Sequence, residues 1–88
     1  MPLAHSVAGS VRVLLFARYA DLLGLATADL PIEAALSVNA VIDYLRGLPG
    51  GEHLPAVPVV AVNHRQVRGD HRLAPGDEVA LLPPMAGG

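Results

Sequence analysis

One segment of this sequence repeats its apolar residues at the spacing of an amphipathic α-helix, and it restricts the possible folds more than any other feature. Ser37 is a favourable N-cap residue for that helix. The apolar residues that follow at helical spacing are Val38, Val41, Ile42, Leu45 and Leu48. Glycine and proline between positions 47 and 51 end the element. The sequence therefore predicts one main helix, against which the other apolar segments must pack.

Several short segments around this helix have the composition of β-strands. Apolar and β-branched runs bounded by turn residues predict strands at 11–16, 27–33, 57–62, 66–67 and 78–82. A short helix at 17–23, ended by Gly24, separates the first two strands. Pro31 cannot donate a ladder hydrogen bond, which favours an edge position for the second strand. Asn63 and His64 predict the turn between the third and fourth strands.

This order of elements, β-β-α-β-β-β, predicts an α+β protein with a mixed sheet of about five strands over one main helix, which is the β-grasp arrangement. The first and last strands would then lie side by side in the middle of the sheet. A single helix covers only one face of a sheet, so the other face is expected to expose an apolar patch. The residues of that patch are Leu14, Phe16, Ala80 and Leu82. Such a patch predicts a protein partner, unless the short helix or the leader folds over it.

We expect a leader at 1–10, a domain at 11–82 and an extended tail at 83–88. The tail has no charged side chain, and its residues are Pro83, Pro84, Met85, Ala86, Gly87 and Gly88. Two prolines favour a stiff arm, and glycines without a Cβ can pass through a narrow channel. A carboxylate becomes reactive when it attacks the α-phosphate of ATP and forms an acyl-adenylate. We therefore expect the Gly88 carboxylate to react inside a partner, the alternative being an ordinary frayed terminus.

The composition excludes several other kinds of function. A net charge of −2 without a basic run argues against nucleic acid and anionic membranes as partners. The chain has no cysteine, which removes thiolate catalysis, disulfides and the iron–sulfur ligands of a ferredoxin. The spacing of the histidines is not that of metal ligands, so the sequence predicts no metal site. These residues are His5, His53, His64 and His71. No apolar stretch is long enough for a membrane span, and we expect a cytoplasmic protein.

Two acidic residues lie at the start of the last predicted strand. Asp77 and Glu78 follow Pro75 and Gly76, which are strong turn residues. A turn before a strand is normally polar, so these carboxylates are expected to be solvated. The alternative is that they pair with arginines of a partner protein.

Three motifs resemble the small subunits of molybdopterin synthase, which belong to the ubiquitin-like sulfur carriers. The resemblance spans nearly the whole domain. The motifs are Val13-Leu14-Leu15-Phe16-Ala17-Arg18 followed by Leu22, Leu23 and Gly24; Ala61-Val62-Asn63; and Gly76-Asp77-Glu78-Val79-Ala80 leading through Leu82 to the tail.

This resemblance implies a specific use of the tail. In that family an ATP-dependent, E1-like activating enzyme adenylates the terminal glycine, and a sulfur donor system converts it to a thiocarboxylate. The large subunit of the synthase receives the tail and transfers the sulfur to cyclic pyranopterin monophosphate, during molybdenum cofactor biosynthesis. By position Gly88 would carry the sulfur, and Phe16, Leu82 and Met85 would contact partners. Two small subunits would flank a dimer of large subunits, as a heterotetramer.

The resemblance also implies that this chain binds no cofactor and acts as the sulfur-donating, non-catalytic subunit of the complex. Two alternatives stay open. The same chemistry could serve thiamine synthesis or another sulfur product. A ubiquitin-like interaction module or modifier would instead form an amide between Gly88 and a target lysine. The chain itself contains no lysine, so it cannot build side-chain-linked polymers of itself.

Overall fold

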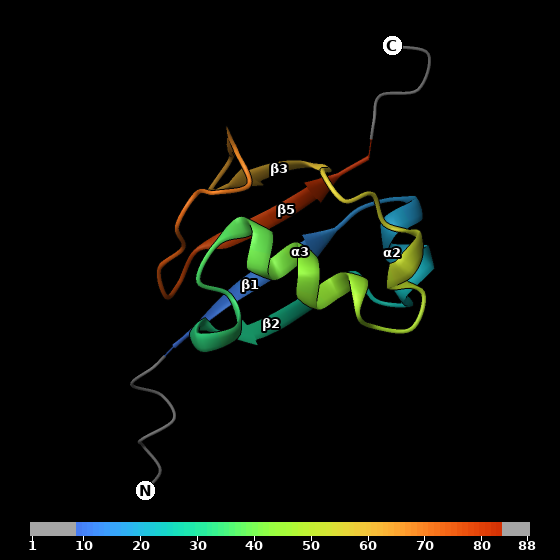
Figure 1. Cartoon of the computed structure of the whole chain (residues 1–88), viewed down its shortest axis with the longest axis horizontal. Helices are drawn as coiled ribbons and strands as arrows, with labels where there is room; N and C mark the ends of the chain where they lie inside the picture. The colour runs from blue at the N-terminus through green and yellow to red at the C-terminus, as the bar shows by residue number, and fades with distance from the viewer. Residues whose placement is uncertain (1–8, 84–88) are drawn as a thin grey trace, which may run out of the picture.

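The structure is a computed structural model and describes residues 9–83. Helix α3 lies across one face of a five-stranded sheet, and the shorter helix α2 lies at one end of the sheet (Figure 1). The elements in chain order are β1 (Ser10–Leu15), α2 (Arg18–Leu23), β2 (Thr27–Pro31), η1 (Ile32–Ala34), α3 (Val38–Arg46), η2 (Gly51–His53), β3 (Val59–Val62), β4 (Arg65–Val67) and β5 (Glu78–Leu82).

The sheet has the strand order β2-β1-β5-β3-β4, which confirms the predicted α+β β-grasp fold. The first and last strands lie side by side at its centre and run parallel, with Val13 opposite Val79. The other three pairings are antiparallel. Strand β2 is at one edge, as Pro31 predicts, and the short strand β4 is at the other.

The core lies between the sheet and α3. In β1 the side chains of Val11, Val13 and Leu15 are buried, and the residues between them are half-buried or exposed. This alternation follows from the two-residue period of a strand, and it confirms the predicted faces. Helix α3 buries four of the five apolar positions predicted from its spacing: Val38, Val41, Ile42 and Leu45. The fifth, Leu48, lies beyond the end of α3 at Arg46 and is half-buried. The Ser37 hydroxyl accepts a hydrogen bond from the amide of Ala40 at 3.2 Å, which confirms the predicted N-cap.

Five predicted strand boundaries are wrong by one or two residues. Strands β1 and β4 each begin one residue earlier than predicted, at Ser10 and Arg65. Strand β2 ends at Pro31 because the chain then forms the 3₁₀ turn η1. Strand β3 begins at Val59, since Pro58 has no N–H to donate to a ladder and Val57 is 89% exposed. Strand β1 ends at Leu15 because Ala17 adopts a positive φ of 50° and turns the chain away from the sheet. None of the described helices has the length and apolar character needed to cross a bilayer.

Candidate functional site

The last strand of the domain, β5, brings the chain to the tail from the centre of the sheet. Leu82 is the final residue of β5, and Pro83 is the last residue that the structure describes. The end of β5 lies on the same side of the molecule as α2 (Figure 1). The other predicted tail residues, which lie outside the described part, are Pro84, Met85, Ala86, Gly87 and Gly88. A segment that follows Leu82 therefore starts between two strands, β1 and β3, that are both paired with β5.

The sheet face opposite α3 carries a group of apolar side chains next to this point. Leu14 of β1 and Ala61 of β3 both lie opposite Ala80 of β5 in the strand register. Together with Phe16 and Leu82, these residues line a shallow cavity of about 290 Å³. We call this group the open-face patch; its residues are Leu14, Phe16, Ala61, Ala80 and Leu82. The structure thus brings together all four residues that were expected there and adds Ala61, which the sequence motifs contain.

The open-face patch is not covered by α2. Phe16 is 44% exposed, and Val59, opposite Leu82 in the register, is 41% exposed. Helix α2 instead buries Tyr19 in the core and contacts η2. No residue of α2 is among the described residues that line the patch. The alternative in which the short helix folds over these side chains is therefore wrong, whereas residues 1–8 of the leader lie outside the described part.

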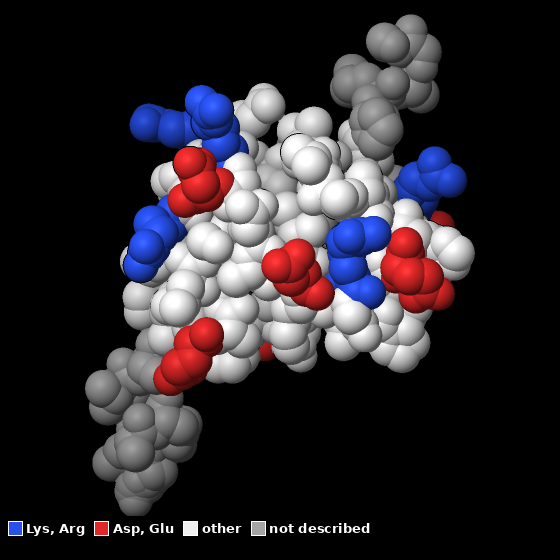
Figure 2. Space-filling model, viewed as in Figure 1, with Lys and Arg blue, Asp and Glu red and all other residues white. Residues whose placement is uncertain are grey.

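Polar residues close the other end of the patch. His64 and Glu78 complete the lining of its cavity, and His64 Nε2 lies 3.8 Å from Glu78 Oε1. Both side chains are more polar than the rest of the lining, so the apolar part of the cavity is directed toward the end of β5. The opposite side of the molecule, over α3, shows acidic and basic side chains interspersed, without a broad area of one sign (Figure 2).

Asp77 has a structural role that the sequence analysis missed. Its carboxylate accepts hydrogen bonds from the Asn63 side-chain amide at 3.0 Å and from the Ala74 backbone amide at 2.9 Å. Asn63 Oδ1 in turn accepts from the Glu78 amide at 2.9 Å. Asp77 stays partly exposed, so these bonds add a structural role to the solvated turn that the sequence predicts, and pairing with a partner's arginine stays a prediction. Asn63 and Asp77 are far apart in the sequence, so their contact could not be predicted directly. The one signal in the sequence was that Asn63 follows a predicted strand and Asp77 precedes another, and these two strands, β3 and β5, are neighbours in the sheet.

Among the described residues, the titratable side chains that line the cavity of the open-face patch are His64 and Glu78. Within residues 9–83, no three histidine, aspartate or glutamate side chains come together as a possible metal site. The arrangement is instead suited to contact: an apolar surface beside the point where the chain leaves a central strand.

Solved structures with a similar fold include small archaeal modifier proteins and subunits of molybdopterin converting factors. SAMP1 from Haloferax volcanii is similar at a TM-score of 0.74 and 28% identity, over 91% of this chain and all (100%) of that one. A putative molybdopterin converting factor subunit 1 from Pyrococcus furiosus is similar at a TM-score of 0.72 and 25% identity, over 88% of this chain and 99% of that one.

A third similar structure is a complex between two proteins. It contains subunits 1 and 2 of the molybdopterin-converting factor from Helicobacter pylori, and the matched chain has a TM-score of 0.68 and 22% identity. The match covers 90% of this chain and 99% of that one, and at this identity it supports the fold alone.

The family comparison agrees with the fold, and its matched range includes the tail residues. Residues 13–88 match the model of the ThiS family, from the middle of β1 to the final glycine. The matched segment contains the whole open-face patch and the complete tail. Because this match covers most of the chain, the protein belongs to the ThiS family of ubiquitin-like, β-grasp sulfur carriers.

Proposed function

We propose that this chain is the sulfur-carrier small subunit of a molybdopterin synthase, with the terminal Gly88 as the sulfur-bearing residue. Family membership supports the carrier role. Similarity to subunit 1 of molybdopterin converting factors supports the pathway. The observation that carries the proposal is the position of the open-face patch, which borders the end of β5 where the chain enters the tail.

The proposed chemistry needs a terminal carboxylate and a partner enzyme. A carboxylate oxygen of Gly88 attacks the α-phosphate of ATP, and pyrophosphate leaves as the acyl-adenylate forms. A sulfur donor then supplies sulfide, which attacks the acyl carbon, and AMP leaves. The product is a C-terminal thiocarboxylate. The activating enzyme binds the ATP, so this chain holds no cofactor beyond its own covalent sulfur.

The partner would receive the tail and the patch together. Pro83, Pro84, Met85, Ala86 and Gly87 would pass into the active site of the large subunit, where Gly88 donates sulfur to cyclic pyranopterin monophosphate. The open-face patch would be buried against the same subunit, because an apolar surface of this kind is stabilised when it is removed from water. The large subunit would supply the catalytic groups, and this chain would supply the sulfur.

Reconstitution with the large subunit tests the proposal. The chain in its thiocarboxylate form, incubated with large subunit and cyclic pyranopterin monophosphate, is expected to yield molybdopterin and to return to the carboxylate form. The unmodified chain and a Gly88 deletion are the controls, and both are expected to yield none. If the chain binds the large subunit but transfers no sulfur, the molybdopterin assignment is contradicted. A sulfur carrier for thiamine or another product would then be the favoured function.

A modifier function is the second candidate, and the similarity to SAMP1 favours it. In that case the activated Gly88 would be attacked by the amine of a target lysine, and an amide would form in place of a thiocarboxylate. The two functions differ in one readout. Conjugates resistant to reducing agents are expected only for the modifier, whereas a sulfur-containing terminus on the free chain is expected only for the carrier.

A further inference from the structure

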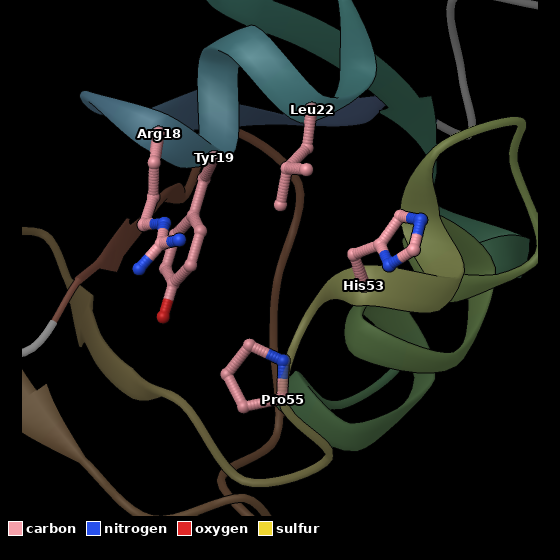
Figure 3. Close-up of a pocket in the computed structure, with 5 residues that line it drawn as sticks. All are labelled: Arg18, Tyr19, Leu22, His53 and Pro55. Carbon is pink, nitrogen blue, oxygen red and sulfur yellow. The ribbon is translucent and has the colours of Figure 1, made fainter.

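The end of β5, where the tail begins, lies between the open-face patch and a second cavity. This second cavity has a volume of about 520 Å³ and separates α2 from the segment after η2. Arg18 and Tyr19 extend from α2 into this space, and Pro55 and His53 lie across from them (Figure 3). Leu22 completes the lining. We call it the helix-side cavity.

Strand register places this cavity beside the end of β5. The parallel pairing of β1 and β5 continues to Leu15 opposite Leu81, so the chain enters α2 next to the last residues of β5. On the other side of β5, Val59 is opposite Leu82, and the segment that carries Pro55 leads directly into Val59. The two walls of the helix-side cavity are therefore the chain segments that continue from both neighbours of β5. A protein that binds the chain just after β5 would therefore lie next to both walls.

The cavity presents positive charge without a carboxylate of its own. Two other cavities contain an arginine, and each also contains an acidic side chain: Arg12 with Asp29 and Glu78, and Arg65 with Asp77. Arg18 forms no ion pair with any residue of the described part. His53 is paired with Glu52 at 3.5 Å, and neither Glu52 nor any other acid is among the described residues that line the cavity. A carboxylate from outside the chain would complement Arg18.

Arg18 is held at the cavity by a backbone conformation of Ala17 that is unfavourable, and at a helix position that is unfavourable for positive charge. Ala17 has φ 50° and ψ −126°, a backbone region that is unfavourable for a residue with a Cβ. Arg18 follows as the first residue of α2, although positive charge is disfavoured at a helix N-terminus. The conformation of Ala17 lets Phe16 face the open-face patch while Tyr19 is buried on the opposite side. Helix stability alone does not explain an arginine here.

We propose that the helix-side cavity binds an aspartate or glutamate side chain of the partner protein that holds the tail, with Arg18 as the charged donor and the Tyr19 hydroxyl as a second donor. Arginine and a hydroxyl together can satisfy both oxygens of one carboxylate. This proposal rests on the proposed carrier function and adds a polar specificity contact to the apolar one. Partners of similar shape that lack this acidic residue would bind the chain with lower affinity.

Charge reversal at Arg18 tests the proposal with the full chain. The Arg18→Glu variant is compared with wild type in two assays: pyrophosphate release by the activating enzyme, and binding to the large subunit by calorimetry. Arg72→Glu is the matched control, because Arg72 is also exposed but lies in the segment before β5, at the other end of that strand. Circular dichroism and thermal unfolding check that every variant is folded, and Arg18→Ala repeats the test without the added negative charge.

Arg18→Glu is expected to weaken the interaction with one of the two partners at least about tenfold. For the activating enzyme, this is a higher half-saturating concentration of the carrier at an unchanged maximal rate. For the large subunit, it is a higher dissociation constant. Arg72→Glu should change either value less than about twofold. Added salt should weaken wild-type binding more than Arg18→Ala binding, since the ion pair is screened. Reversing the matching acid of the partner to lysine should restore binding of Arg18→Glu, which a purely structural role of Arg18 would not produce.

The proposal is overturned if Arg18→Glu behaves as wild type with both partners, or if Arg72→Glu has an equal effect. In both of these outcomes wild type is still activated and bound, so the carrier function itself stands. A wild-type chain that neither partner accepts would overturn the carrier function and this inference together.

Discussion

Asn63 combines two tasks at the residue scale. Its φ of 51°, with 72° at His64, forms the tight turn that joins β3 to β4, and both angles suit a type I′ hairpin. Its side chain also binds Asp77 and the amide of Glu78, and so joins the hairpin to the start of β5. The turn was predictable from the sequence, because asparagine tolerates this backbone region. The bond to Asp77 was not, because it depends on the pairing of β3 with β5.

Replacement of Asn63 by alanine is expected to destabilise the protein by about 2 kcal/mol, through two lost hydrogen bonds and a strained turn. His64→Ala is the matched control, because it places alanine at a positive φ without removing a close hydrogen bond. It should cost about 1 kcal/mol or less. Urea unfolding measures both, and equal losses would show that the Asn63 side chain adds nothing beyond its backbone conformation.

Ala17 is the residue whose conformation the sequence did not signal. Alanine rarely adopts a positive φ, so nothing in the sequence marked the sharp change of direction between β1 and α2. Glycine has no Cβ to oppose it. The Ala17→Gly substitution is therefore expected to raise the free energy of unfolding by about 1 kcal/mol.

The control is Ala20→Gly, which lies inside α2 and is expected to lower the stability by about 0.5–1 kcal/mol. The two substitutions make the same chemical change, so opposite signs in thermal unfolding would identify the strain at Ala17. A loss of stability in both variants would contradict the positive φ.

Strand β1 shows at the element scale how much of the fold was contained in the sequence. Alternation predicted which residues of β1 face the core, and helical spacing predicted the buried face of α3. The ends of elements depended on three-dimensional context: Pro58 and the conformation of Ala17 shortened strands that their apolar composition would have extended. The open-face patch was predictable because its residues alternate with core residues. The helix-side cavity was not, because Arg18 and Pro55 are distant in sequence.

Val13 of β1 and Phe16, which follows the end of β1, should separate stability from partner binding. Phe16→Ser is expected to lower the stability less than Val13→Ala, because Phe16 is 44% exposed, and to weaken binding to the large subunit at least about tenfold. Val13→Ala, on the core face with 0% exposure, should instead cost about 2 kcal/mol of stability. Binding measured below the unfolding transition should be nearly normal for Val13→Ala. The reverse pattern would show that the open-face patch is not the interface.

The N-cap of α3 gives a further test of how local sequence defines an element. Ser37→Ala removes the hydrogen bond to the Ala40 amide and should lower the stability by about 1 kcal/mol. Ser37→Asp retains an acceptor at the same place and should recover most of the loss. Thermal unfolding followed by circular dichroism compares the three proteins, and an equal loss in Ser37→Asp would assign another role to the hydroxyl.

At the scale of the whole molecule, the features that we assign to function gather at one end. The central strand β5 ends there, with the open-face patch on one side of the sheet and the helix-side cavity near the other. The domain contributes surfaces for recognition, and the proposed reaction takes place at the terminal glycine. In this proposed division the partner enzymes, and not the domain, would supply the catalytic groups.

Mass spectrometry of the C-terminus tests the central claim most directly. The chain is incubated with ATP, the activating enzyme and a sulfur donor, and the intact protein and its C-terminal peptide are then measured, with the Gly88 deletion as control. The account predicts that one terminal oxygen of Gly88 is replaced by sulfur and that the deletion variant stays unmodified. An unmodified wild-type terminus, under conditions that convert an established sulfur carrier, would contradict the account.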